Sequence, residues 1–205
     1  MRAGRETRTR RILDQLPLIR CLMELSDDTV LADTRRWIEK AVIGLNLCPF
    51  ARSVYVKNQV RIVVSRARHV DAFLDELDRE LDLLANTPAE EIDTTLLVHP
   101  ALFPDFFVFN DFLNVVDEVV AEHDLEGVIQ VASFHPAFQF EGVDADDISN
   151  FTNRAPYPTL HLLREDSVER AVASDGGNAD EIVERNIRTL EALGRQGWVD
   201  LLSKA

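Results

Sequence analysis

The sequence is poor in cysteine and contains no long apolar run. Only Cys21 and Cys48 occur among the 205 residues, in unlike sequence contexts, so we expect reduced thiols and no disulfide framework. No apolar stretch approaches the roughly 20 residues needed to cross a bilayer. The arginine-rich start also lacks the apolar centre of a secretory signal. These absences predict a cytoplasmic protein.

Several catalytic and nucleotide-binding motifs are missing as well. The chain has no glycine-rich phosphate loop, dinucleotide fingerprint, Cys-x-x-Cys pair, Gly-x-Ser-x-Gly elbow or His-Glu-x-x-His helix. Their absence argues against nicotinamide-dependent, P-loop and common serine-hydrolase chemistry.

Positive charge is scarce outside the N-terminal segment. The chain carries 36 acidic and 22 basic residues, which gives a formal net charge of −14 at pH 7. A surface so acidic repels phosphate backbones and anionic membranes. We therefore expect neither nucleic acid nor a membrane as partner, and we interpret the acidity as serving solubility.

The composition otherwise suits one packed domain. Apolar residues make up 46% of the chain and charged residues 28%, close to the averages of globular proteins. Residues 1–32 show no convincing amphipathic period, so we expect an N-terminal extension there, either disordered or the result of a mis-assigned start. Residues 33–205 are predicted to form a single α/β domain.

Hydrophobic spacing predicts alternating helices and strands in that domain. Apolar runs indicate strands at 60–65, 94–98, 128–134 and 159–163. Helical spacing is found from 33 to 45, from 71 to 85, between the cap Asp105 and Gly127, from 166 to 173 and from 182 to 193. The alternation implies two crossover units with parallel pairing. The expected fold is a four-stranded, mostly parallel or mixed sheet with helices packed on it, either ferredoxin-like or small doubly wound.

Two histidines follow strands in the same way. His99-Pro100 and His135-Pro136 each stand just beyond an apolar strand, and the proline ends the ladder. If the strands are parallel, both imidazoles emerge at the edge where open α/β folds bind ligands. Alternatively, each ring only satisfies loop carbonyls at the end of its strand.

A long polar loop starts at the same edge. Residues 139–158 contain Asn150, Asn153 and Arg154, and irregular loops of this length are commonly functional. We expect the guanidinium and the two amides to bind a small polar or anionic substrate. Bracing of the loop is the alternative role of Arg154.

Cys48-Pro49 is a third place where a potentially reactive side chain directly precedes a proline, as in the two His-Pro pairs. With His99 and His135, Cys48 would form either an activated thiolate or a Cys/His site for a divalent metal. The sequence separations are long, 51 residues from Cys48 to His99 and 36 between the histidines, so the spacing does not decide between them. Cys48 as a small buried apolar residue is the remaining alternative.

Three motifs together resemble a known family. The run Trp37-Ile-Glu-Lys-Ala-Val-Ile-Gly-Leu-Asn-Leu-Cys-Pro-Phe-Ala51, the two His-Pro steps and Asn153-Arg-Ala-Pro-Tyr-Pro158 are similar to the bacterial domain-of-unknown-function family numbered 1415. The resemblance covers about residues 33–195. It implies a bacterial origin and supplies no activity.

Two functions follow from these patterns. The first is an enzyme that acts on a small polar or anionic substrate, with Cys48, His99 and His135 at the reactive centre and Asn150, Asn153 and Arg154 orienting the substrate. The second is a non-catalytic domain that binds a small ligand or a partner at the sheet edge.

Overall fold

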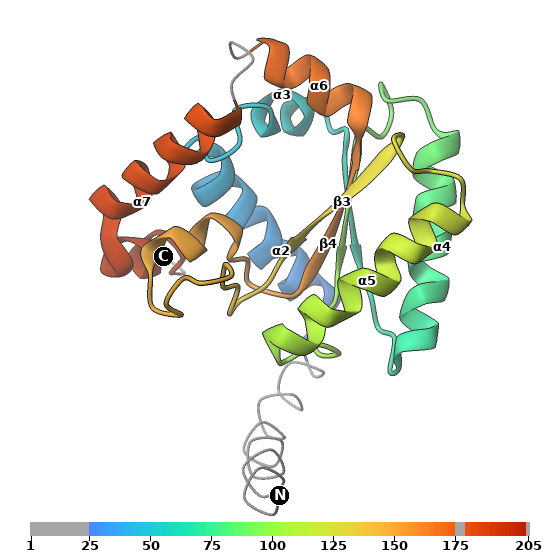
Figure 1. Ribbon diagram of the computed structural model, residues 1–205, viewed down its shortest axis with the longest axis horizontal. Helices are drawn as coiled ribbons and strands as arrows, with labels where there is room; N and C mark the ends of the chain where they lie inside the picture. Colours follow the sequence, from blue (N-terminus) through green and yellow to red (C-terminus); the bar gives the residue numbers. More distant parts are fainter. Residues whose placement is uncertain (1–24, 175–178, 204–205) are drawn as a thin grey trace, which may run out of the picture.

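A four-stranded mixed sheet forms the centre of the fold (Figure 1). The computed structural model describes residues 25–174 and 179–203. The sheet has the order β1-β2-β4-β3, in which β1 and β2 are parallel and β4 is antiparallel to both of its neighbours. The strands are β1 (Val60–Val64), β2 (Thr94–Val98), β3 (Ile129–Phe134) and β4 (Thr159–Arg164).

The pairing of the second and third strands differs from the prediction. The crossover from β1 to β2 is parallel as expected, and β3 also runs in the direction of β2. However, β2 and β3 do not pair, because β4 lies between them. The long connection at 135–158 brings the chain back to this gap, and β4 then fills it in the opposite direction.

Helices occupy both sides of the sheet. Ser26 caps the first helix through the Thr29 amide, and Asp105 caps α5 through the amides of Phe107 and Val108, as its sequence predicts. The helices are α2 (Asp27–Trp37), the π-helix η1 (Ile38–Ile43), α3 (Ala51–Val56), α4 (Val70–Asn86), α5 (Phe106–Glu122), the 3-10 helix η2 (Ile148–Asn153), α6 (Glu165–Ser174) and α7 (Ala179–Leu202). None in the described ranges is long and apolar enough to cross a membrane.

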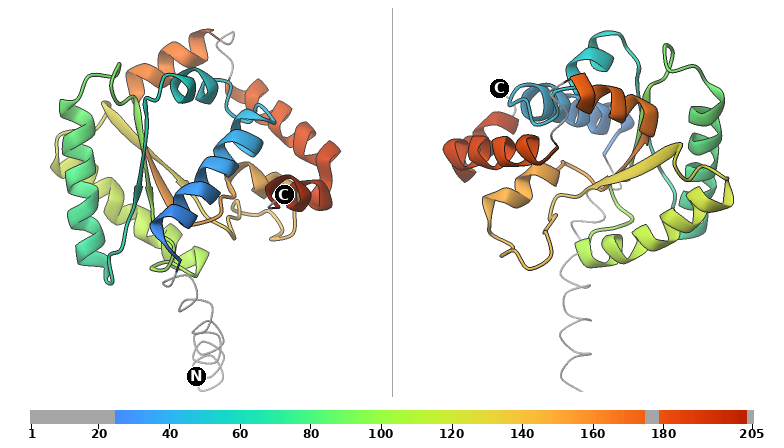
Figure 2. Two further views of the ribbon diagram at one scale, coloured as in Figure 1. Left: turned by 180° about the vertical axis from the view of Figure 1, so that it is seen from behind. Right: turned by 45° about the horizontal axis from the view of Figure 1, so that its top comes forward.

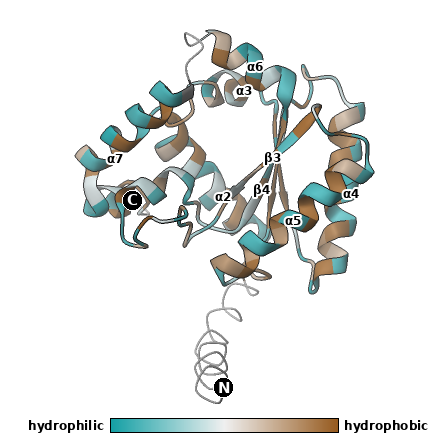
Figure 3. Cartoon of the chain, in the orientation of Figure 1, coloured by the Kyte–Doolittle hydropathy of each residue, from teal (hydrophilic) through white to brown (hydrophobic). Residues whose placement is uncertain are grey.

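Two clusters of buried apolar side chains lie on the two faces of the sheet. Figure 3 shows that much of the sheet is coloured as hydrophobic. On one face, α4 and α5 pack against Leu97, Leu160 and Leu162. On the other, α2, η1 and α7 enclose a cluster that includes Leu96 and Val98. Figures 1 and 2 show α4 and α5 on one side of the sheet and α2 and α7 on the other.

The first described helix begins before the expected domain boundary. Helix α2 starts at Asp27, and Val30 is fully buried, although both lie in the segment assigned to an N-terminal extension. Residues 26–28 are polar because they form the cap and the first turn of the helix. Hydrophobic spacing therefore does not reveal where the helix starts. The rest of the predicted extension, residues 1–24, lies outside the described residues, as do residues 175–178.

The last helix has a kink at its predicted end. Gly194 adopts a non-helical conformation with a φ of 67°, which ends the first segment of α7 there, and a second helical segment follows it. The part after this kink places Trp198 against Phe151 of η2, with the ring centroids 5.4 Å apart. Helix α7 therefore packs on η1 and η2 and stands off from the sheet (Figure 1).

Candidate functional site

His99 and His135 leave the sheet at one edge. Each directly follows the last residue of its strand, and β2 and β3 run in the same direction. Both side chains are buried, with 2% exposure each. Their rings pack against aromatic residues, His99 against Phe73 and His135 against Phe109. They therefore lie on the α4 and α5 side of the sheet.

The imidazole of His99 is fully bonded to nearby backbone. Its Nδ1 accepts hydrogen bonds from the amides of Leu102 at 2.7 Å and Ala101 at 3.2 Å. Because Nδ1 accepts, the proton of the neutral ring is on Nε2, which donates to the carbonyl of Ala67 at 2.8 Å. Burial lowers the pKa of His99 below its ordinary value, more than the hydrogen bond to Ala67 raises it.

His135 repeats this arrangement. Its Nδ1 accepts from the amide of Ala137 at 3.0 Å, and its Nε2 donates to the carbonyl of Phe103 at 2.9 Å. Burial again lowers the pKa of the imidazole. Neither histidine has a free lone pair for a metal or a substrate in this arrangement. The geometry matches strand-end bracing, and catalytic roles for the two rings stay predictions.

Cys48 lies on the other side of the sheet, in the turn after η1. Its side chain is half-buried, and burial raises the pKa of the thiol, although hydrogen bonds from the amides of Phe50 and Ala51 oppose this. Within residues 25–174 and 179–203, no group of three His, Cys, Asp or Glu side chains could hold a metal ion. The structure thus does not bring Cys48, His99 and His135 together as a metal centre.

Asn150 and Arg154 are engaged inside the long loop. The Asn150 amide donates to the carbonyl of Asp144 at 2.8 Å and its oxygen accepts from the amide of Phe140 at 2.9 Å. The Arg154 guanidinium donates to the carbonyl of Ala145 at 2.7 Å and stacks over the Phe151 ring. Both residues brace the loop.

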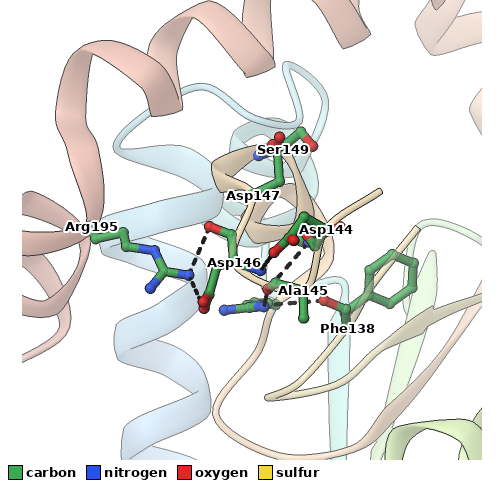
Figure 4. Close-up of polar contacts among 9 residues, drawn as sticks. Phe138, Asp144, Ala145, Asp146, Asp147, Ser149 and Arg195 are labelled. Carbon is green, nitrogen blue, oxygen red and sulfur yellow. Dashed lines mark hydrogen bonds and ion pairs between the residues drawn. The ribbon is translucent and has the colours of Figure 1, made fainter. Parts of the chain in front are cut away.

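Helix α7 is attached to the same loop. Figure 4 shows Arg195 reaching from α7 to Asp146, whose carboxylate lies 2.6 Å from the guanidinium. A depression of about 360 Å³ lies beside Arg154 and Trp198. Its charged lining residues are engaged within the protein, since Arg154 donates to loop carbonyls and Arg36 forms an ion pair with Asp33 at 2.8 Å.

A larger cavity lies between the sheet and the helices opposite α4 and α5. We call it the sheet cavity. It measures about 970 Å³ and contains the predicted residues Cys48 and Asn153, but neither His99 nor His135. Its apolar walls come from the sheet, α2, η1, α6 and α7, and include Trp37, Val42, Leu96, Ala132, Phe134, Leu163, Val168, Ala171 and Val183.

One polar pair, the buried Thr94 and the part-buried His161, lies on the sheet face of this cavity. The Thr94 hydroxyl donates its proton to the carbonyl of Leu162 at 2.6 Å. Its oxygen therefore accepts from Nε2 of His161, which lies 2.7 Å away on the neighbouring strand. This arrangement leaves the unprotonated Nδ1 of His161 without a partner among the described residues.

The surroundings of His161 keep its ring neutral. Part of the ring surface is accessible because it lines the cavity, but protein surrounds it and Phe134 packs beside it at 6.0 Å between centroids. Burial lowers the pKa of His161 to about 4. At neutral pH, the residue therefore presents a hydrogen-bond acceptor in a mostly apolar space.

Comparison with known proteins places the chain in a family. The family described as a protein of unknown function (DUF1415) matches residues 29–200. The chain belongs to the DUF1415 family. This confirms the resemblance seen in the sequence. No match was found among curated proteins or among solved structures.

The sequence pattern of this DUF1415 chain did not single out Thr94 or His161. His161 lies within the strand predicted at 159–163, and its sequence context indicates no role for it. The useful signal was the lone histidine within the run Thr159-Leu-His-Leu-Leu163, on the same face of β4 as Leu163. That signal alone does not show that Thr94 is its partner, because the pairing of β2 with β4 spans more than 60 residues.

Proposed function

We propose that this DUF1415 chain binds a small, largely apolar molecule in the sheet cavity. The observation that carries the proposal is the space of about 970 Å³ with His161 and Thr94 on its sheet face. Ligand sites of about 300–1,000 Å³ with apolar walls and few polar groups are typical of small-molecule binding. This is the binding alternative predicted from the sequence, at a different place from the edge of the two histidines.

Filling the cavity tests this proposal. Ala132 lies on β3 directly opposite His161 and lines the cavity, so Ala132→Phe places a ring in the space. Ala85→Phe adds the same group at an exposed position of α4, on the other side of the sheet. Ala171→Phe on α6 is a second blocking variant, for use if Ala132→Phe does not fold.

The readout is ligand-observed NMR with a set of neutral aromatic fragments. We expect fragments to bind the unchanged protein and the Ala85→Phe variant, and to lose binding in the folded blocking variants. If no fragment binds, or if binding survives in both blocking variants, the cavity is not the binding site.

The enzymatic alternative depends on Cys48. Its thiol lines the same cavity, so a bound electrophile would lie within its reach. However, its raised pKa keeps the thiol protonated, and no histidine is hydrogen-bonded to it. We therefore favour a binding function over an enzymatic one for this cavity.

A cytoplasmic location, a bacterial origin and the lack of nucleic-acid or membrane partners stay predictions.

A further inference from the structure

We infer that the ligand of the sheet cavity is an uncharged or cationic molecule that donates hydrogen bonds, and is not an anion. The inference rests on the proposed function, because it names the class of molecule that the same cavity takes. It follows from which polar atoms of the lining are already bonded within the protein and which are not.

The buried donors of the lining are engaged. The Thr94 hydroxyl donates to Leu162, and the Asn186 amide donates to the carbonyl of Leu47 at 2.7 Å. The Asn153 amide lies 3.4 Å from the carbonyl of Ser133. The Thr94 hydroxyl has no further proton to offer, and each of the two neutral amides keeps one N–H besides the one it already donates.

Arg164 is engaged in a similar way. It is the half-buried cationic residue of the lining, and its guanidinium donates to backbone carbonyls around the end of α4, among them those of Leu84 and Ile92. This bonding draws the guanidinium to the α4 side of the sheet. The remaining cationic side chains of the lining, Lys57 and Arg170, are exposed at the rim.

The groups without a partner are acceptors. Nδ1 of His161 is unprotonated and faces no donor within the described residues. Asn186, at 8% exposure, lines the cavity from α7, and its Oδ1 has no hydrogen-bond partner in the described part of the chain. The unpaired Oδ1 of Asn186 is buried, which is costly, whereas Nδ1 of the part-buried His161 is not among the buried atoms without a partner. A ligand that supplies an N–H or O–H group can pair with Nδ1 of His161, and a ligand that lacks such a group cannot.

Charge at the rim supports the same class of ligand. Glu90 and Asp93 line the cavity near the start of β2, together with the exposed Lys57 and Arg170. The rim therefore carries both signs, and the formal charge of the whole chain is −14. Neither the rim nor the interior favours an anion. The inference thus departs from the anionic substrate expected from the sequence.

Three probes of one shape test the inference at neutral pH. 2-Naphthol carries a donor, 2-methoxynaphthalene lacks it, and 2-naphthoate is an anion. We expect 2-naphthol to bind about tenfold more tightly than the methyl ether, since unpaired acceptors discriminate strongly against such analogues. The naphthoate should bind most weakly. The dissociation constants come from titrations followed by ligand-observed NMR.

Two variants of His161 connect this preference to its ring. His161→Phe removes the acceptor and should bring 2-naphthol and the ether to equal affinity. His161→Gln keeps an amide that can donate to Thr94 and accept from the ligand, so the preference should return. If the first variant does not fold, the ¹⁵N resonance of Nδ1 in the unchanged protein supplies the readout, because an accepted hydrogen bond shifts it.

The outcomes separate the two proposals. If no probe binds, or if Ala132→Phe binds all three, the cavity proposal fails and the ligand class fails with it. If all probes bind in the cavity but the ether matches 2-naphthol, or the naphthoate binds most tightly, only the ligand class is overturned. A naphthol preference that persists in His161→Phe also overturns the role of His161.

Discussion

Nε2 of His161 lies 2.7 Å from Oγ1 of Thr94, and this contact joins β4 to β2 across the sheet face of the cavity. The threonine hydroxyl also donates to the carbonyl of Leu162. One side chain thus links two strands and determines which nitrogen of the imidazole is protonated. Several measurable properties follow from this pair and from its surroundings.

Replacing Thr94 should destabilise the fold. Thr94→Val keeps the shape but removes both hydrogen bonds, so we expect the free energy of unfolding to fall by about 1–3 kcal/mol. Urea denaturation measures this change. The neighbouring Thr95 is the matched control, since it is fully buried and its hydroxyl has no partner in the described part of the chain. Thr95→Val should leave stability unchanged or raise it, and equal losses at the two positions would contradict this account.

Lowering the pH should reduce the free energy of unfolding, because His161 resists protonation in the folded protein. Its folded pKa of about 4 is below the ordinary 6.5, so the unfolded chain binds more protons between these values. Stability is fully present above pH 6.5 and is lost as the pH falls toward 4, by up to about 3 kcal/mol from this group. We expect the stability difference between the unchanged protein and His161→Gln to shrink over this window in urea titrations. A difference independent of pH would show that the ring titrates normally.

The edge histidines should matter for stability. His99→Ala leaves the Ala67 carbonyl and two amides without partners, so we expect a loss of about 3 kcal/mol or more in the free energy of unfolding. His69 provides the comparison, because it is exposed and caps α4 through the Ala72 amide. His69→Ala should cost about 1 kcal/mol. A folded His99→Ala variant with unchanged stability would restore the catalytic interpretation.

The Cys48 thiol should react slowly. Its raised pKa leaves little thiolate at pH 8, so a disulfide reagent should modify it more slowly than a free cysteine. The experiment uses a Cys21→Ser background, so that one thiol is counted. Ala132→Phe, which fills the cavity, should slow the reaction further. Rapid modification at pH 7 would instead favour the predicted nucleophile.

Local patterns predicted most elements of the fold. Strand β2 has the predicted bounds, and the Asp105 cap and the emergence of His99 and His135 at one edge depend on short-range chemistry that the sequence displays. The start of α2 at Asp27 was harder to predict, because the polar cap and first turn interrupt the hydrophobic spacing. The end of the first segment of α7 at Gly194 follows from the sequence, but the second segment after this kink was not predicted.

Long-range pairing limited the prediction of the site. Residues near a strand end identify candidates such as His99, but they do not show that Ala67 and Leu102 occupy the ring nitrogens. The contact of Thr94 with His161 depends on β4 lying next to β2, and the cavity depends on α7 standing off from the sheet. Neither relationship has a signature in local sequence.

The insertion of β4 between β2 and β3 also governs the order in which the chain can mature during synthesis. A nascent chain that ends before residue 159 contains β1, β2 and β3, but the inner edges of β2 and β3 have no strand to pair with. Unpaired edges of this kind invite association between chains. The sheet face of the cavity therefore forms late in synthesis, because His161 lies on β4, the strand that completes the sheet. Protection of the growing polypeptide until β4 emerges would serve both solubility and assembly of the cavity.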